Sequence, residues 1–87
     1  MNIDNIQFTK HALMRMEERG VTKAEVVEVM LHPREKIVAN DERFEARGLI
    51  ERGSKIMLLR VIYEHDVVVS VITVVATSKL AKYGVTL

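Results

Sequence analysis

The chain has 87 residues, a formal net charge of +1 at pH 7 and no cysteine. This length gives room for one hydrophobic core, so we expect a single domain over residues 1–87. The lack of cysteine excludes disulfides and thiolate metal sites, and the near-neutral charge does not by itself indicate a nucleic-acid-binding protein.

The first predicted helix covers residues 10–19. Thr9 is a favourable N-cap, the residues after it have helical apolar spacing, and Gly20 is a natural C-terminal stop. Ala12, Leu13 and Met16 lie on one side of this helix and should face the sheet. We therefore expect an amphipathic helix that begins and ends sharply.

A second helix is predicted over residues 23–31. Thr22 and Glu25 have the spacing of a capping box, in which each residue satisfies a backbone amide near the other. Pro33 follows closely, and the residue before a proline is pushed out of helical geometry. The helical half of the chain should end here.

The remaining chain alternates between β-rich runs and turn formers. Four strands are predicted, over residues 36–39, 43–50, 55–64 and 67–77. Their connections are short enough for hairpins, with one turn at His65 and Asp66. The fold class is therefore α+β, with two N-terminal helices packed on an antiparallel sheet of three or four strands.

Both faces of the last two strands are apolar when they are read with a period of two. Leu59, Val61 and Tyr63 lie on one face, whereas Leu58 and Ile62 lie on the other. In the last strand, the reading groups Val67, Val69, Val71 and Val75 against Val68, Ile72 and Val74. Two helices can cover only one face, so we expect a homodimer or a heteromeric complex, unless a long loop covers the second face.

His11, Arg15 and Arg19 form a basic row on the first helix, because their spacing of four residues places them within an arc of about 80°. Two permanent cations beside a histidine favour its neutral form, which accepts a proton. The two arginines can hold a phosphate. The plainer alternative is a solvated helix edge in which Glu17 and Glu18 pair with the arginines.

Arg60 stands in an otherwise apolar strand. Because a buried arginine is costly unless paired, Arg60 either pairs with a carboxylate such as Glu45 or opens onto a phosphate site. Tyr63 and Thr73 add hydroxyl groups in the same two strands. Tyr63 is alternatively a core aromatic residue with its hydroxyl at the edge.

The second half of the chain is locally basic. Arg43 and Arg47 lie in a predicted strand, Lys79 and Lys82 lie near the end, and no acidic residue follows Asp66. A basic face of this kind can bind RNA although the total charge is near zero.

Other signals are weak. The three histidines have no spacing typical of a metal site, and the sequence has neither a glycine-rich phosphate loop nor a nucleophile elbow. We therefore expect no cofactor and no metal. The longest near-apolar stretch, residues 67–76, is too short to cross a bilayer as a helix, and there is no basic leader. A cytoplasmic location is expected.

The sequence resembles a known family of small domains. The residues that carry the resemblance are Phe8-Thr9-Lys10-His11-Ala12, Arg15, Met16, Glu18-Arg19-Gly20-Val21, Glu25-Val26, Leu59-Arg60-Val61-Ile62-Tyr63 and Val71-Ile72-Thr73-Val74. They are similar to the domain-of-unknown-function family DUF4258, which is distantly similar to RelE-like and BrnT-like ribonuclease toxins. The resemblance implies a RelE-like or barnase-like arrangement of helices and sheet, and a cognate antitoxin as partner.

The function hypothesis is a metal-independent ribonuclease of a toxin–antitoxin system. His11, Arg60 and Tyr63 are the candidate catalytic residues. The candidate phosphate-binding or RNA-binding residues are Arg15, Arg19, Arg43, Arg47, Thr73, Lys79 and Lys82. The alternative hypothesis is a non-catalytic interaction module that binds a partner or a second copy through its apolar sheet face. An RNA-binding domain without cleavage is disfavoured, because two Phe and two Tyr offer few stacking platforms.

Overall fold

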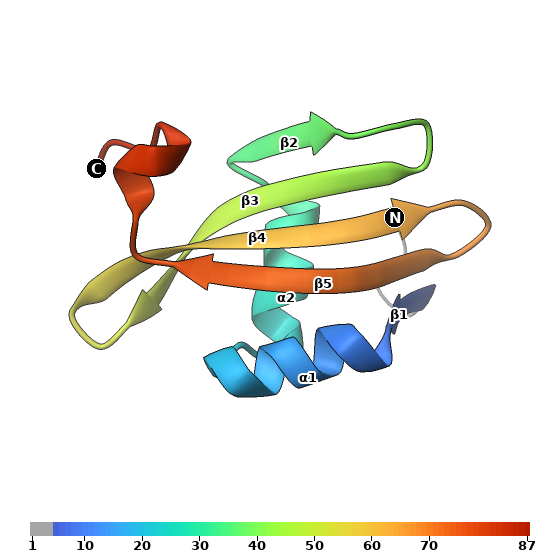
Figure 1. Ribbon diagram of the computed structural model, residues 1–87, viewed down its shortest axis with the longest axis horizontal. Helices are drawn as coiled ribbons and strands as arrows, with labels where there is room; N and C mark the ends of the chain where they lie inside the picture. Colours follow the sequence, from blue (N-terminus) through green and yellow to red (C-terminus); the bar gives the residue numbers. More distant parts are fainter. Residues whose placement is uncertain (1–4) are drawn as a thin grey trace.

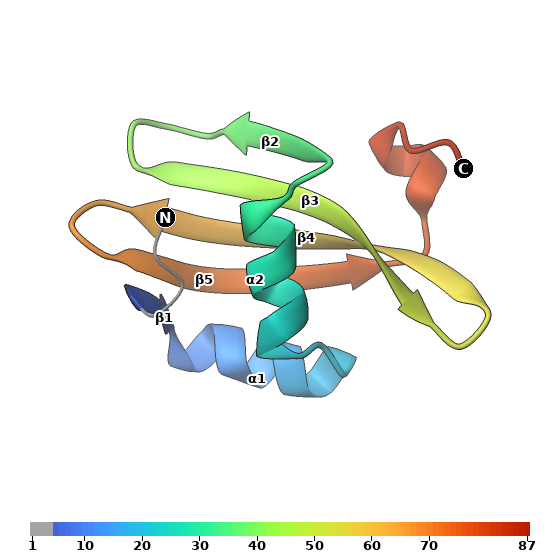
Figure 2. The same cartoon turned by 180° about the vertical axis from the view of Figure 1, so that it is seen from behind.

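Two helices cover one face of a five-stranded mixed sheet with the strand order β1-β5-β4-β3-β2 (Figure 1). The computed structural model describes residues 5–87. In chain order the elements are β1 (Ile6–Phe8), α1 (Lys10–Arg19), α2 (Lys23–Leu31), β2 (Glu35–Val38), β3 (Arg43–Arg52), β4 (Lys55–His65), β5 (Val69–Thr77) and the 3₁₀ turn η2 (Leu80–Tyr83). Seen from behind, α2 crosses the sheet and α1 runs below β5 (Figure 2). The α+β fold class is confirmed.

Both helices begin and end where their caps predict. The Thr9 hydroxyl accepts a hydrogen bond from the Ala12 amide at 3.0 Å, and Gly20 ends α1 with a φ of 66°. The left-handed conformation costs a glycine little, since it has no Cβ. Thr22 and Glu25 form a complete capping box at the start of α2. None of the helices in residues 5–87 has the length and apolarity needed to cross a membrane.

The sheet has more strands than predicted, and it is mixed rather than antiparallel. The additional strand β1 pairs in parallel with β5, where Ile6 lies opposite Val69 and Phe8 opposite Val71. A strand of three residues is too short for an alternating pattern, and its partner lies at the far end of the sequence. The other strands shift by one or two residues, so β2 is Glu35–Val38 and β5 begins at Val69 instead of residue 67.

The core lies between the helices and one face of the sheet. Leu59, Val61 and Tyr63 of β4 are buried there with apolar residues of both helices. Helix α2 approaches β3 closely at Gly48, where an added Cβ would lie 2.8 Å from Val29 Cγ2. Glycine at this position therefore allows the helix to pack directly on the backbone of the strand.

A bulge in β5 changes the predicted faces of this strand. Thr73 pairs with Ile62 and Val71 pairs with Tyr63, so one extra residue, Ile72, is inserted between them. The insertion places Val74 with Val71 on the helix-covered face and turns Thr73 and Val75 to the outer face. The predicted grouping of Val75 with Val71 is wrong for this reason, because a strict period of two fails at a bulge.

The C-terminal segment, residues 78–87, covers one end of the outer sheet face (Figure 1). Leu58 is fully buried on this face, although it does not belong to the core cluster below the helices. Tyr83 and Val85 line a hollow together with Leu58. The chain thus covers part of the second apolar face itself.

The tip of the β3–β4 hairpin is fastened to the turn between the helices. Arg52 donates hydrogen bonds to the Glu25 carboxylate and to the Gly20 carbonyl oxygen. The hydrogen bond from Arg52 is the main cause that lowers the pKa of Glu25 from 4.5 to about 2. The ion pair therefore fastens the hairpin tip to the N-terminal end of α2.

This ion pair should make the stability depend on acid pH. Because the folded state lowers the pKa of Glu25, its contribution is complete above pH 4.5 and is lost as the pH falls toward 2. Glu25→Gln keeps a capping oxygen but not the charge, and should lower the unfolding free energy at pH 7 by about 1–2 kcal/mol, since the pair is partly exposed. Urea unfolding at pH 7 and pH 2.5 measures the difference.

The matched control is Glu28→Gln on the exposed side of the same helix. We expect it to change the unfolding free energy little at either pH. A loss in Glu25→Gln that is equally large at pH 2.5 would contradict the ion-pair explanation.

Candidate functional site

Helix α1 is held along the edge of β5 that β1 leaves open. The Thr9 amide donates to the Val71 carbonyl at 3.0 Å, and the Thr9 hydroxyl donates to the Ile72 carbonyl at 2.9 Å. Within residues 5–87, β1 pairs with β5 only up to Val71. Helix α1 therefore lies along β5 beyond Val71, where the pairing of β1 with β5 ends.

This arrangement brings the basic row of α1 and a hydroxyl of β5 together. His11, Arg15 and Arg19 line a hollow of about 260 Å³ with Thr73, Val74 and Val75. We call it the His11 hollow. The sequence predicted the basic row from helical spacing, and it predicted Thr73 as a hydroxyl group in the same two strands as Arg60. The structure joins the four polar residues in one place.

The His11 hollow has an excess of positive charge. Arg15 pairs with Glu18 at 3.1 Å, with both side chains more than two-fifths exposed. Arg19 has no carboxylate oxygen within 4.0 Å among the described residues, and it lies in the last turn of α1, where the helix dipole favours a cation. An exposed imidazole beside an unpaired guanidinium can accept a proton close to a bound anion.

Arg60 does not belong to the His11 hollow. It lies on the outer sheet face, where its Nε and Nη2 donate to the two carboxylate oxygens of Glu45, each at 2.9 Å. Its Nη1 donates to the Tyr83 hydroxyl at 3.2 Å, and its guanidinium stacks 4.9 Å from the centre of that ring. The predicted pairing with Glu45 is present, and these contacts occupy all three guanidinium nitrogens.

Glu45 also accepts a hydrogen bond from Arg47, whose other end pairs with Glu35 at 2.9 Å. The hydrogen bond from Arg60 is the main cause that lowers the pKa of Glu45, and the same contact raises the pKa of Arg60. The Arg47 guanidinium lies 5.2 Å from the centre of the Tyr83 ring. Arg47 and Arg60 are thus structural partners of one carboxylate and one aromatic ring.

Two further predicted site residues are committed to the fold. Arg43 pairs with Glu64 across the β3–β4 ladder. Tyr63 is only 1% exposed and stacks on Phe44 with ring centres 5.5 Å apart, and burial raises its pKa. A phenol enclosed in the core does not reach a substrate. Tyr63 is therefore a core aromatic residue, which was the alternative to a catalytic role.

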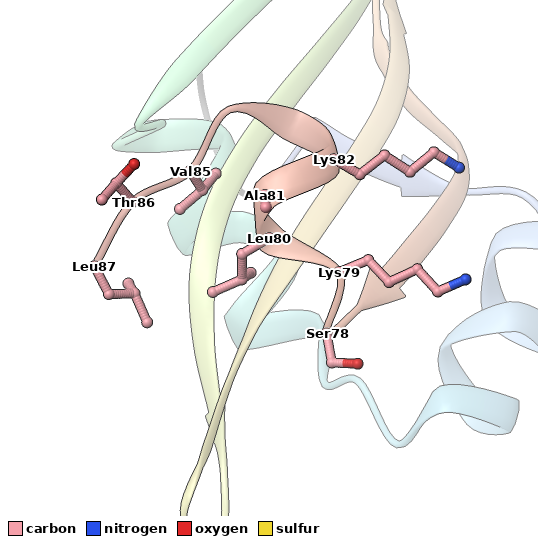
Figure 3. A pocket seen from close by; sticks show the side chains of 8 residues that line it. All are labelled: Ser78, Lys79, Leu80, Ala81, Lys82, Val85, Thr86 and Leu87. Carbon is pink, nitrogen blue, oxygen red and sulfur yellow. The ribbon is translucent and has the colours of Figure 1, made fainter.

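Lys79 and Lys82 lie on the C-terminal segment and are exposed. Figure 3 shows their side chains extending in the same direction, toward the side of β5, whereas Leu80 points the opposite way. They border a hollow of about 570 Å³ that is lined by residues 78–82 and 85–87. Of the predicted basic residues, these two and the row on α1 remain available to an anion.

The sequence matches the family described as a domain of unknown function, DUF4258, over residues 8–79. The chain belongs to this family. No curated protein and no solved structure matches it. The family match ends before η2, so it covers the His11 hollow but not Tyr83 or Lys82.

Tyr83, which lies beyond the part of the chain that matches DUF4258, was not predicted from the sequence as a contact of the site residues. It contacts Arg47 and Arg60 from a segment that is 23 residues beyond Arg60 in the chain. A tyrosine in a short polar tail has no periodic signal. Its only indication was its position near basic residues.

Proposed function

We propose that this DUF4258 domain is a metal-independent ribonuclease whose site is the His11 hollow. One observation supports the proposal: the hollow combines an exposed histidine with an arginine that has no carboxylate partner among the described residues. The proposal does not use four of the predicted residues, because carboxylates or the core engage their side chains: Arg43, Arg47, Arg60 and Tyr63.

The reaction is transesterification of an RNA phosphodiester. Neutral His11 takes the proton of a 2′-hydroxyl, the 2′-oxygen forms a bond to the adjacent phosphorus, and the bond from phosphorus to the 5′-oxygen breaks. Arg15 and Arg19 stabilise the negative charge on the pentavalent phosphorane, and Thr73 donates a hydrogen bond to a phosphate oxygen. The leaving 5′-oxygen takes its proton from solvent. The products are a 2′,3′-cyclic phosphate and a free 5′-hydroxyl.

The test is cleavage of single-stranded RNA by the purified protein in the presence of a chelator. We expect cleavage with cyclic phosphate ends, and no cleavage of a matching strand in which every 2′-hydroxyl is replaced by hydrogen. If the folded protein cleaves neither free RNA nor ribosome-bound messenger, the ribonuclease proposal fails and the interaction module becomes the favoured function.

The toxin part of the proposal rests on the resemblance to RelE-like and BrnT-like proteins. A toxin of this kind should stop bacterial growth when its expression is induced, and a co-expressed antitoxin should restore growth. The alternative, an interaction module, was based on an exposed apolar sheet face. That face is less apolar than expected, because it carries the ion pairs of Glu45, Arg47 and Arg60, and because the C-terminal segment covers Leu58. Self-association stays a prediction.

A further inference from the structure

We propose that the His11 hollow is one wall of a longer basic groove that binds the backbone of a single-stranded polynucleotide along β5. The inference rests on the proposed function for the chemical class of the ligand. Beyond the proposed function, it states how far the site extends, which segment forms its second wall, and that the nucleic acid is single-stranded.

The first wall is the basic row of α1. Successive members of the row, His11, Arg15 and Arg19, are each four residues apart, which corresponds to a rise of about 6 Å per step along the helix. This step is comparable to the distance between neighbouring phosphates in a polynucleotide strand. The row therefore presents one polar side chain for each phosphate rather than a cluster at one point.

The second wall is the C-terminal segment, and the floor is β5. Thr73 and Val75 point to the outer face of β5, on the side that this segment covers. Lys79 and Lys82 extend together toward β5 and the side on which α1 lies (Figure 3). No acidic residue follows Asp66 in the sequence. The second wall thus adds two cations without an acidic side chain of its own.

The groove is suited to one strand without base recognition. Its floor is a single β-strand, and the row on α1 offers one line of three polar side chains, which suits the phosphates of one backbone. No aromatic ring is among the residues that line the His11 hollow. Tyr83 is held by Arg47 and Arg60. Binding should therefore depend on phosphates and not on base identity.

Fluorescence anisotropy with labelled 2′-deoxy strands of eight nucleotides tests the groove, because these strands cannot react through a 2′-hydroxyl. We expect similar affinities for different homopolymers and weaker binding of a dinucleotide and of a duplex. With four phosphate contacts, the slope of log K against log salt should be about −3, falling to about −1.5 in the double variant K79Q/K82Q. The affinity of that variant should fall about tenfold.

The matched control is K36Q/K55Q, which removes the same charge from β2 and from the start of β4. We expect its affinity to stay within about twofold of the wild type. An equal loss in both double variants would overturn the groove and indicate a net-charge effect. Tighter binding to duplex or to anionic lipid vesicles would overturn it as well.

The two proposals fail in different ways. If the protein binds the strands but does not cleave RNA, the ribonuclease proposal alone is refuted. If K79Q/K82Q cleaves RNA and binds the strands as well as the wild type does, the groove alone is refuted.

Discussion

RNA cleavage should slow by about a hundredfold to ten-thousandfold when His11 is replaced by Ala, because this is the usual cost of losing a positioned general base. His11 is the histidine of the His11 hollow, and the other two, His32 and His65, do not line it. Initial rates of cleavage in chelator measure the effect.

The exposed position of His11 separates catalysis from folding. His11 lies on the solvent side of α1, so the variant should keep the circular dichroism spectrum and the unfolding midpoint of the wild type. The matched control is His65→Ala at the end of β4, which is also exposed. The base assignment is wrong if His11→Ala keeps the full rate, or if both variants lose the same activity.

Replacing Glu45 by Gln should lower the unfolding free energy by about 2–4 kcal/mol. The Glu45 side chain is 14% exposed and accepts hydrogen bonds from both Arg60 and Arg47. Without its charge, two partly buried guanidinium groups lose their common partner, and the remaining desolvation cost is not offset. Urea unfolding at pH 7, followed by circular dichroism, gives the value.

Glu35→Gln is the matched control, since Glu35 pairs with the same Arg47 but is 56% exposed. We expect a loss below about 1 kcal/mol. The folded state lowers the pKa of Glu45, so the stabilisation by this carboxylate is complete at neutral pH and declines as the pH falls through its folded value. Equal losses in the two variants would show that the position of Glu45 between two arginines has no special effect.

The sequence predicted most accurately the features that depend on neighbouring residues. Thr9 and Gly20 fixed both ends of α1, and the capping box of Thr22 and Glu25 fixed the start of α2, because each cap makes hydrogen bonds to backbone groups within about one turn. The basic row on α1 followed from helical periodicity alone. These signals lie within short windows, which explains why both helix boundaries agree with the structure.

Features that depend on distant residues were predicted incompletely. β1 is defined by β5, the faces of β5 are set by a bulge opposite Ile62 and Tyr63, and the surroundings of Arg60 include a tyrosine of the C-terminal segment. Glu45 was predicted as a partner for Arg60, but a phosphate site remained an equal alternative because the sequence does not show which strands are neighbours. The alternation of apolar and polar residues along a strand does not indicate which distant residues contact it.

The parallel pairing of β1 with β5 has a consequence for the order in which the His11 hollow forms during synthesis. The α1 wall of the His11 hollow is made early, but Thr9 is anchored to the sheet by the carbonyl groups of Val71 and Ile72. A contact that spans 63 residues closes late, because the chain between its ends must first be made and ordered. A nascent chain on the ribosome, surrounded by RNA, therefore holds no completed site until β5 has emerged and joined the sheet.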